Sequence, residues 1–173
     1  MATSILSAKL TAFSYELPAV MSRAESLKAI YEEHQNRIYN LAFYLTDNEM
    51  TAESLTAKVF SNVFAVNMTP SGEVLDRALV TELRQTVAIG DITLNVPDST
   101  EVATARRNVK RVVLERAVME VPETERMIFL MHDVEGYDHS RIARTLGIST
   151  DESRNGLHQA RLAVRRAAAQ VKF

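Results

Sequence analysis

The stretch covering residues 138–161 constrains the fold of this chain more than any other, because it dictates two short helices joined by a sharp turn. Apolar residues recur at helical spacing on both sides of Gly147, which stands where the first helix must stop in a left-handed conformation that glycine adopts cheaply. Ile148 then fills the corner, and Ser149 with Glu152 forms a capping box that opens the second helix. The pattern predicts a helix-turn-helix.

The two faces of this motif are predicted to differ in composition, one apolar and the other polar and basic. The buried face is predicted to consist of Ile142, Ala143, Leu146, Leu157, Ala160 and Val164. The outer or flanking face is predicted to offer groups to a DNA major groove through Thr150, Ser153, Arg154, Asn155, His158, Gln159, Arg161 and Arg165. Arginine and asparagine there can bond base edges, while Arg161, Arg165 and Arg166 suit phosphates. A helical hairpin with a solvated polar face is the alternative.

Two features of the second helix count against tight DNA binding. Asp151 and Glu152 favour the start of a helix electrostatically, but they repel the phosphates of DNA. Gly156 lies in the middle of the helix, where glycine costs ~1 kcal/mol relative to alanine. The sequence therefore predicts a module that binds DNA weakly by itself.

The rest of the chain also predicts helices, because glycine (5) and proline (4) are rare and apolar residues recur every three or four positions. A capping box at Ser22 and Glu25 opens a first helix, and the polar turn 46–49 separates it from a second. Further helices are expected over 73–89 and 101–120, and from Pro122 onward. We predict an all-α chain of two small domains and a flexible linker, divided into a partly disordered leader (1–22), a first domain (23–89), the linker (90–100) and a second domain (101–173).

The net charge of −2 conceals two halves of opposite sign. Residues 1–104 carry 7 Lys/Arg against 13 Asp/Glu, whereas residues 105–173 carry 13 against 9. A basic half suits nucleic acid, and attraction between the halves predicts a closed, salt-sensitive form. The absence of cysteine fits a reducing compartment, with the cytoplasm as the default. The first 20 residues lack the apolar run of a signal peptide or membrane helix, so no membrane insertion is expected.

Residues 120–149 and 153–161 closely resemble the fourth conserved region of extracytoplasmic-function sigma factors of bacterial RNA polymerase, and residues 27–45 and 51–64 are similar to the second region. The resemblance implies a winged-helix-like, region 4 type of helix-turn-helix that reads the minus-35 promoter element and touches the polymerase flap. It also implies that the second helix docks on core polymerase. Promoter DNA, core RNA polymerase and an anti-sigma factor are the implied partners, and the implied polymerase-binding residues are Glu53, Ser54, Leu55, Lys58 and Phe60.

The chain departs from that family at several positions. Ser54, Ala57 and Lys58 stand where family members commonly carry an acidic residue, glutamine and glutamate, and Arg84 is nearly the only basic residue of the third helix. The chain has no tryptophan to stack on melted DNA. Two hypotheses follow: a sigma initiation factor, or a sigma-like protein that binds an anti-sigma factor or another regulator without melting a promoter.

Other classes of function find less support in the sequence. No glycine-rich phosphate loop and no motif that groups Ser, His and Asp occurs, so we expect neither an enzyme nor a cofactor. A metal site built from His132, Asp133, Glu135, Asp138 and His139 is the minor alternative, since such ligands suit borderline metals. A polar turn with Tyr137 packed inward is the favoured reading of that segment.

Overall fold

The computed structural model describes residues 22–96 and 111–170, and it contains helices and loops without a strand in these two ranges. The all-α prediction is therefore confirmed. In chain order the elements are α1 (Arg23–Thr46), α2 (Glu49–Val66), α3 (Gly72–Leu83), α5 (Arg111–Met119), α6 (Glu123–Phe129), the π-helix η1 (Leu130–Val134), α7 (His139–Leu146) and α8 (Thr150–Gln170).

The first two helices begin and end where local sequence chemistry predicts. The Ser22 hydroxyl accepts from the Glu25 N–H at 3.3 Å, and the Glu25 carboxylate accepts from the Ser22 N–H at 2.7 Å, which confirms the capping box. Helix α1 ends at the predicted polar turn, where Asp47 is left-handed with φ 51°. Asn48 then caps α2 by accepting from the Thr51 N–H at 2.8 Å. This two-residue connection folds α2 back along α1.

Three predicted helix boundaries need correction or lie outside the described residues. Helix α3 ends at Leu83 and not near residue 89, because the backbone turns there and lets Ile89 enter the core. The Gly90 N–H then donates to the Thr124 hydroxyl at 3.0 Å. Pro122 is the N-cap of α6 and not its first residue. The predicted helix over 101–120 is seen as α5 in its last part, and residues 101–110 lie outside the described ranges.

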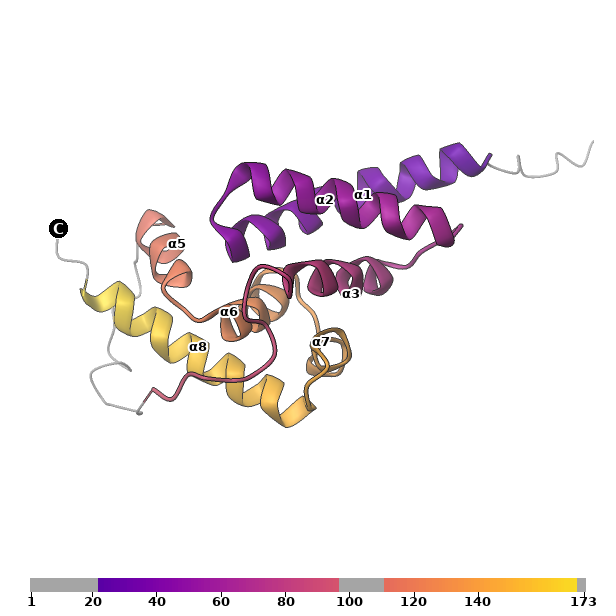
Figure 1. The fold of residues 1–173 in the computed structure, drawn as a ribbon. Coiled ribbons are helices and arrows are strands. Elements are labelled where there is room, and N and C mark those ends of the chain that lie inside the picture. The colour runs from indigo at the N-terminus through magenta and orange to yellow at the C-terminus, as the bar shows by residue number, and fades with distance from the viewer. Residues whose placement is uncertain (1–21, 97–110, 171–173) are drawn as a thin grey trace, which may run out of the picture.

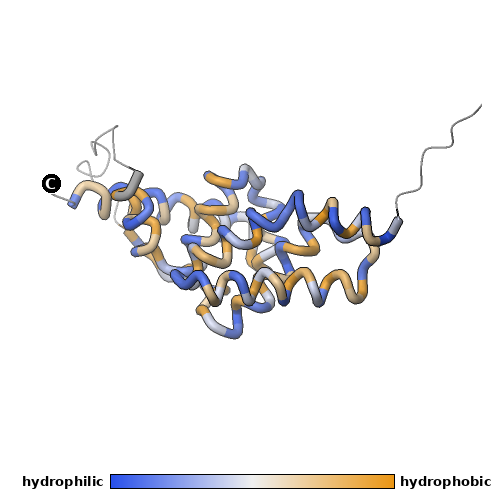
Figure 2. Tube along the Cα trace, turned by 90° about the horizontal axis from the view of Figure 1, so that it is seen from above, coloured by the Kyte–Doolittle hydropathy of each residue, from blue (hydrophilic) through white to orange (hydrophobic). Residues whose placement is uncertain are grey.

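The helices pack in layers around α6 (Figure 1). Helices α1 and α2 form an antiparallel pair, α3 lies against both, and α8 runs along the opposite side of α6. Orange and blue segments alternate along the helices in Figure 2, as expected when each helix buries one stripe. One buried apolar cluster runs through α1–α3 and α5–α8, so the packing continues across the predicted domain boundary. No helix within 22–96 or 111–170 has both the length and the apolar character that crossing a membrane requires.

A buried charge cluster, which we call the Asp76 cluster, fastens α7 to α1 and α3. The Asp76 side chain is fully buried and pairs with Arg37 of α1 at 3.0 Å and with Arg141 of α7 at 2.6 Å. The Arg141 guanidinium also stacks on the Tyr137 ring, 3.6 Å from its centroid. A buried carboxylate needs such partners to offset its lost hydration. The orientation of α7 relative to the first three helices is therefore fixed by charge as well as by apolar packing.

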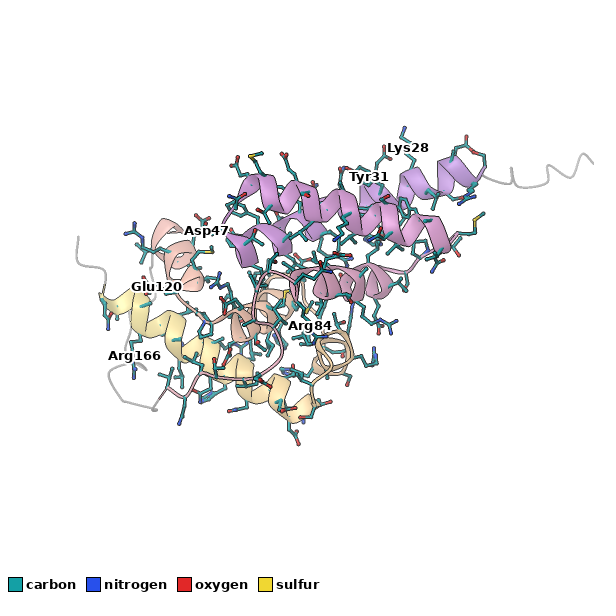
Figure 3. All side chains as sticks on the ribbon, viewed as in Figure 1. Lys28, Tyr31, Asp47, Arg84, Glu120 and Arg166 are labelled. Atoms are coloured by element: carbon teal, nitrogen blue, oxygen red, sulfur yellow. The ribbon has the colours of Figure 1, made fainter. Side chains whose placement is uncertain are left out.

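Two further arginines tie the halves together through backbone carbonyls. Arg126 of α6 donates to the Tyr44 carbonyl near the end of α1, at 2.8 Å, and to the Val121 carbonyl, also at 2.8 Å. Arg84, labelled in Figure 3 where α3 meets α7, donates to the Leu146 carbonyl at the end of α7. These bonds satisfy carbonyls that the ends of helices leave without partners.

Candidate nucleic-acid interface

The helix-turn-helix is built by caps at each of its ends. The Asp138 carboxylate opens α7 by accepting from the Arg141 N–H at 2.7 Å. Gly147 closes α7 in the left-handed region, with φ 70°. Ser149 and Glu152 then form the predicted capping box of α8, with reciprocal bonds of 3.1 and 2.7 Å. The predicted helix, turn and helix are therefore confirmed.

The inner face of the motif is the predicted one. All six of its apolar residues are at most 7% exposed: Ile142, Ala143, Leu146, Leu157, Ala160 and Val164. Gly156 belongs to this face, because a Cβ there would lie 2.7 Å from Cδ1 of Ile128 and 2.9 Å from Cδ1 of Ile92. The glycine thus allows α6 and residue 92 to approach the backbone of α8, which accounts for a residue that is locally unfavourable in a helix.

The outer face of α8 carries most of the predicted DNA contacts. Arg154, Asn155, His158, Arg161 and Arg165 are exposed, and Thr150 and Gln159 are half-buried. Three of the exposed residues are arginines, spread over three turns of one helix. A helix that presents cations and amides along one side has the shape and charge required to enter a major groove.

The expectation that Ser153 faces outward is wrong. Its side chain is fully buried, and its hydroxyl forms a 2.9 Å hydrogen bond with Nδ1 of His139 on α7. The reason is helical phase, because Ser153 precedes Gly156 and Leu157 by three and four positions and so shares their inner stripe. Ser153 therefore links the two helices of the motif and is not on its outer face.

Two of the arginines on α8 already hold carboxylates. Arg161 forms a bidentate pair with Asp133 of η1, at 2.6 and 2.9 Å, and Arg154 pairs with Asp151 at 2.9 Å. Burial raises the pKa of Asp133, but hydrogen bonds from Arg161 and His132 outweigh it, so the pKa lies below its ordinary value. A phosphate near Arg161 must compete with this carboxylate.

The acidic start of α8 has a structural explanation. The pKa of Glu152 is lowered by its hydrogen bonds with the side chain and backbone of Ser149, so the carboxylate stays charged at the helix N-terminus. Asp151 is paired with Arg154. The Glu152 carboxylate therefore stabilises the N-terminus of α8. The charge of Asp151, which would repel a phosphate, is partly offset by Arg154 of the same helix.

The predicted polymerase-binding residues fall into two groups. Glu53, Ser54 and Lys58 are exposed on α2, and Lys58 forms an ion pair with Glu82 of α3. Leu55 is 7% exposed and Phe60 is 4% exposed, with the Phe60 ring against Tyr31 at a centroid distance of 4.8 Å. Both residues are used by the packing of α2 against its neighbours, and their implied role in polymerase binding stays a prediction.

The minor metal-site alternative finds no support in the geometry. Among the described residues, no three His, Cys, Asp or Glu side chains come together as a metal site. The His132 and His139 rings stack with centroids 4.7 Å apart, while Asp133 pairs with Arg161 and Asp138 caps α7. Tyr137 is 7% exposed, as the polar-turn reading of this segment predicts.

Sequence reasoning missed one segment that touches the motif, residues 91–96, which we call the strap. Burial alternates along it: Ile92, Leu94 and Val96 lie inward, and the residues between them are exposed. The strap runs along α8 after leaving α3 (Figure 1). The available signal was the strict alternation of apolar and polar residues from Ile92 to Val96, which is typical of an extended chain covered on one side.

The geometry of residues 111–170 defines a helix-turn-helix module of the class that binds DNA. Comparison with protein families agrees, since residues 111–164 match the family described as Sigma-70, region 4. The match contains α5, α6, η1, α7 and most of α8, and it covers less than half of the chain. No curated protein matches the chain. The matched region supports a relationship to the sigma-70 family and a regulatory, DNA-binding role.

Proposed function

We propose that the protein is a sigma factor of the extracytoplasmic-function type, which binds core RNA polymerase and directs it to promoters. The observation that carries the proposal is the row of exposed cations on α8, in a helix-turn-helix that matches sigma-70 region 4. Such a factor acts in the cytoplasm. An anti-sigma factor is the regulator expected for this type.

Within this proposal, α8 reads the minus-35 element from the major groove. Arg154, Asn155, His158 and Gln159 contact base edges, because arginine matches guanine and the amides match adenine. Arg161 and Arg165 lie further along α8 and contact phosphates, and Thr150 at its start does the same. The exposure of these side chains supports the assignment, with Gln159 and Thr150 the least exposed of the set.

The proposed contact with core polymerase uses the exposed side of α2. Glu53, Ser54 and Lys58 project from it, and the Met50 side chain is 80% exposed. A shallow cavity of about 300 Å³ lies beside these residues, between α2 and the end of α3. An exposed methionine next to a mixed-charge surface suits a protein partner, since methionine adapts its shape to a contact.

The test is transcription by core polymerase on a library of random promoter sequences, with and without the full chain. We expect a new set of transcripts with a shared upstream element. Arg154→Ala should relax sequence preference at one position of that element, whereas Lys28→Ala on α1, which is also exposed, should change nothing. If the chain neither binds core polymerase nor yields specific transcripts, the proposal is wrong.

One observation favours a second candidate, a sigma-like protein that binds a regulator without melting a promoter. The third helical segment has two basic residues, Arg77 and Arg84, and the guanidinium of Arg84 is engaged by the Leu146 and Ile89 carbonyls. It is therefore occupied by backbone and not offered to a melted strand. Binding to an anti-sigma factor in the absence of any transcript would select this candidate.

A further inference from the structure

The strap is held on α8 and α6 by a regular set of backbone contacts. The Thr93 and Leu94 N–H groups both donate to Oε1 of Glu125, the first at 2.6 Å, and the Val96 N–H donates to Oε1 of Gln159. Extended backbone otherwise exposes these donors to water or pairs them with another strand. Side chains of the second half thus accept hydrogen bonds from the strap backbone, as a neighbouring strand would do in a sheet.

The inward side chains of the strap pack against α8. Cδ1 of Ile92 reaches to within 2.9 Å of the place where a Gly156 Cβ would stand. Leu94 and Val96 pack on Leu162 and Ala163 of α8, and Leu162 is only 4% exposed. Leu162 belongs to α8 but not to the main core cluster, and within the described residues it forms a small apolar cluster with Leu94 and Val96 of the strap.

The strap also forms a hydrogen bond with Gln159, a side chain that we assign to DNA contact. Gln159 contacts adenine through both its carbonyl oxygen and its amide nitrogen, and the oxygen is the atom that the Val96 N–H occupies. The major groove is about 12 Å wide and just admits one helix, whose diameter with side chains is about 10–12 Å. An extended chain lying on α8 beside Gln159 therefore competes with DNA for the same space.

Glu125, which anchors the strap, is buried at a cost in free energy. The Glu125 side chain is fully buried, and its second oxygen, Oε2, has no hydrogen-bond partner among the described residues. A buried carboxylate with few partners is costly, and removal of the strap admits water to it. Hydration of Glu125 offsets part of the lost contacts, which makes departure of the strap feasible without unfolding α6 or α8.

From these contacts we propose that the strap is an intramolecular cover of α8, which must leave before α8 enters the major groove. The inference rests on the proposed function. When only a fraction of molecules has the strap released, the apparent dissociation constant for DNA rises in inverse proportion to that fraction. A protein of this design binds DNA weakly when idle, and it gains affinity when a partner, such as core polymerase, holds the strap elsewhere.

The experiment compares two double variants of the full chain. One changes inward residues of the strap, and the other changes exposed residues. Leu94→Ser with Val96→Ser removes inward contacts, and Thr93→Ser with Asn95→Ser changes the exposed side as a matched control. The probe is a duplex enriched from a random-sequence pool by the wild-type chain together with core polymerase. We expect the inward variant to bind this duplex roughly tenfold more tightly than wild type in the absence of polymerase, and the control to match wild type.

Hydrogen exchange on the wild-type chain gives a second readout that needs no variant. The amide protons of Thr93, Leu94 and Val96 should be protected in the free protein and lose protection on binding the duplex, while α8 keeps its own. Equal affinity of the inward variant and wild type, with protection kept in the complex, overturns the inference and leaves the proposed function standing. Failure to enrich any duplex overturns the proposed function, and the inference with it.

Discussion

The two helices of the helix-turn-helix carry two arginines (α7) and four arginines (α8), and they use them in different ways. On α7, the half-buried Arg141 pairs with the buried Asp76 and Arg144 pairs with Glu73 at 3.1 Å, so both cations face the acidic first half. On α8, Arg154 and Arg165 are exposed to solvent. The difference teaches that the basic charge of this half is divided: the arginines of α7 hold the first three helices, and those of α8 lie on the face that we propose for DNA.

The attraction expected between the acidic and basic halves therefore acts through a few ion pairs where α7 meets α1 and α3. The hydrogen bond from Arg144 lowers the pKa of Glu73, and both partners belong to the contact between α3 and α7. Salt screens exposed pairs such as this one, but it screens the buried Asp76 cluster far less. The contact between the halves is therefore expected to weaken at high salt without being lost.

The largest expected effect comes from removing the carboxylate that α7 depends on. Asp76→Ala leaves Arg37 and Arg141 largely buried with no counter-charge, and it should lower the free energy of unfolding by about 3–5 kcal/mol. Urea denaturation followed by circular dichroism measures the loss. Glu73→Ala removes the exposed carboxylate of the same helix and should cost much less. Similar losses for both variants would mean that burial does not distinguish the two arginines of α7.

A smaller loss is expected at the corner that sets the angle between the two helices. Gly147 has φ 70°, so Gly147→Ala should destabilise the chain by about 1–2 kcal/mol through left-handed strain. Gly90→Ala is the matched control, because nothing lies within 4 Å of a Cβ at that position and its φ is not in the left-handed region. Thermal unfolding of the two variants side by side tests the difference.

The comparison between α7 and α8 is sharpened by a pair of arginine variants. Arg165→Ala should weaken DNA binding evenly across sequences, lower the slope of log affinity against log salt by about one, and leave the melting temperature unchanged. Arg144→Ala should do the reverse, with a small drop in melting temperature that disappears at high salt. If Arg144→Ala also lowered the salt slope, α7 would belong to the DNA surface.

The smallest effect is a pH dependence at the junction of α7 and α8. Burial, His132 and the nearby Arg154 and Arg161 charges lower the pKa of His139 below its ordinary 6.5. The unfolded chain then binds the proton more readily, so stability is complete above 6.5 and falls as the pH drops below it.

His139→Asn keeps a hydrogen-bonding group near Ser153 but has no titrating ring. Its stability should change less than that of wild type between about pH 7 and pH 5. Some dependence should remain, because burial also lowers the pKa of His34 on α1. Unfolding free energies measured across this range test the prediction, and identical slopes for the variant and wild type would contradict it.

Features decided within a few residues were predictable from the sequence. The capping boxes at Ser22 and Ser149, the turn at Asp47 and the left-handed Gly147 all depend on chemistry within one helical turn. The apolar stripe of the helix-turn-helix was predictable for the same reason, since its period is that of the helix. The assignment of the exposed positions on α8 to DNA stays a prediction.

Features decided by distant partners were not predictable in this way. The inward position of Ser153 follows from helical phase, but its hydrogen-bond partner, His139, lies on α7 and is set by how the two helices pack. The partners of Asp76 and Glu125 lie on α1, α7 and the strap, and no local rule pairs them.

The bond from Arg126 to the Tyr44 carbonyl bears on how the molecule folds. Helix α1 has no basic residue in its last turn, and the guanidinium that bonds a carbonyl there comes from α6, 82 positions along the chain. The end of the first helix is thus completed only when the second half has docked. The chain should therefore melt in a single cooperative transition, because part of the end of α1 is satisfied by a helix of the second half.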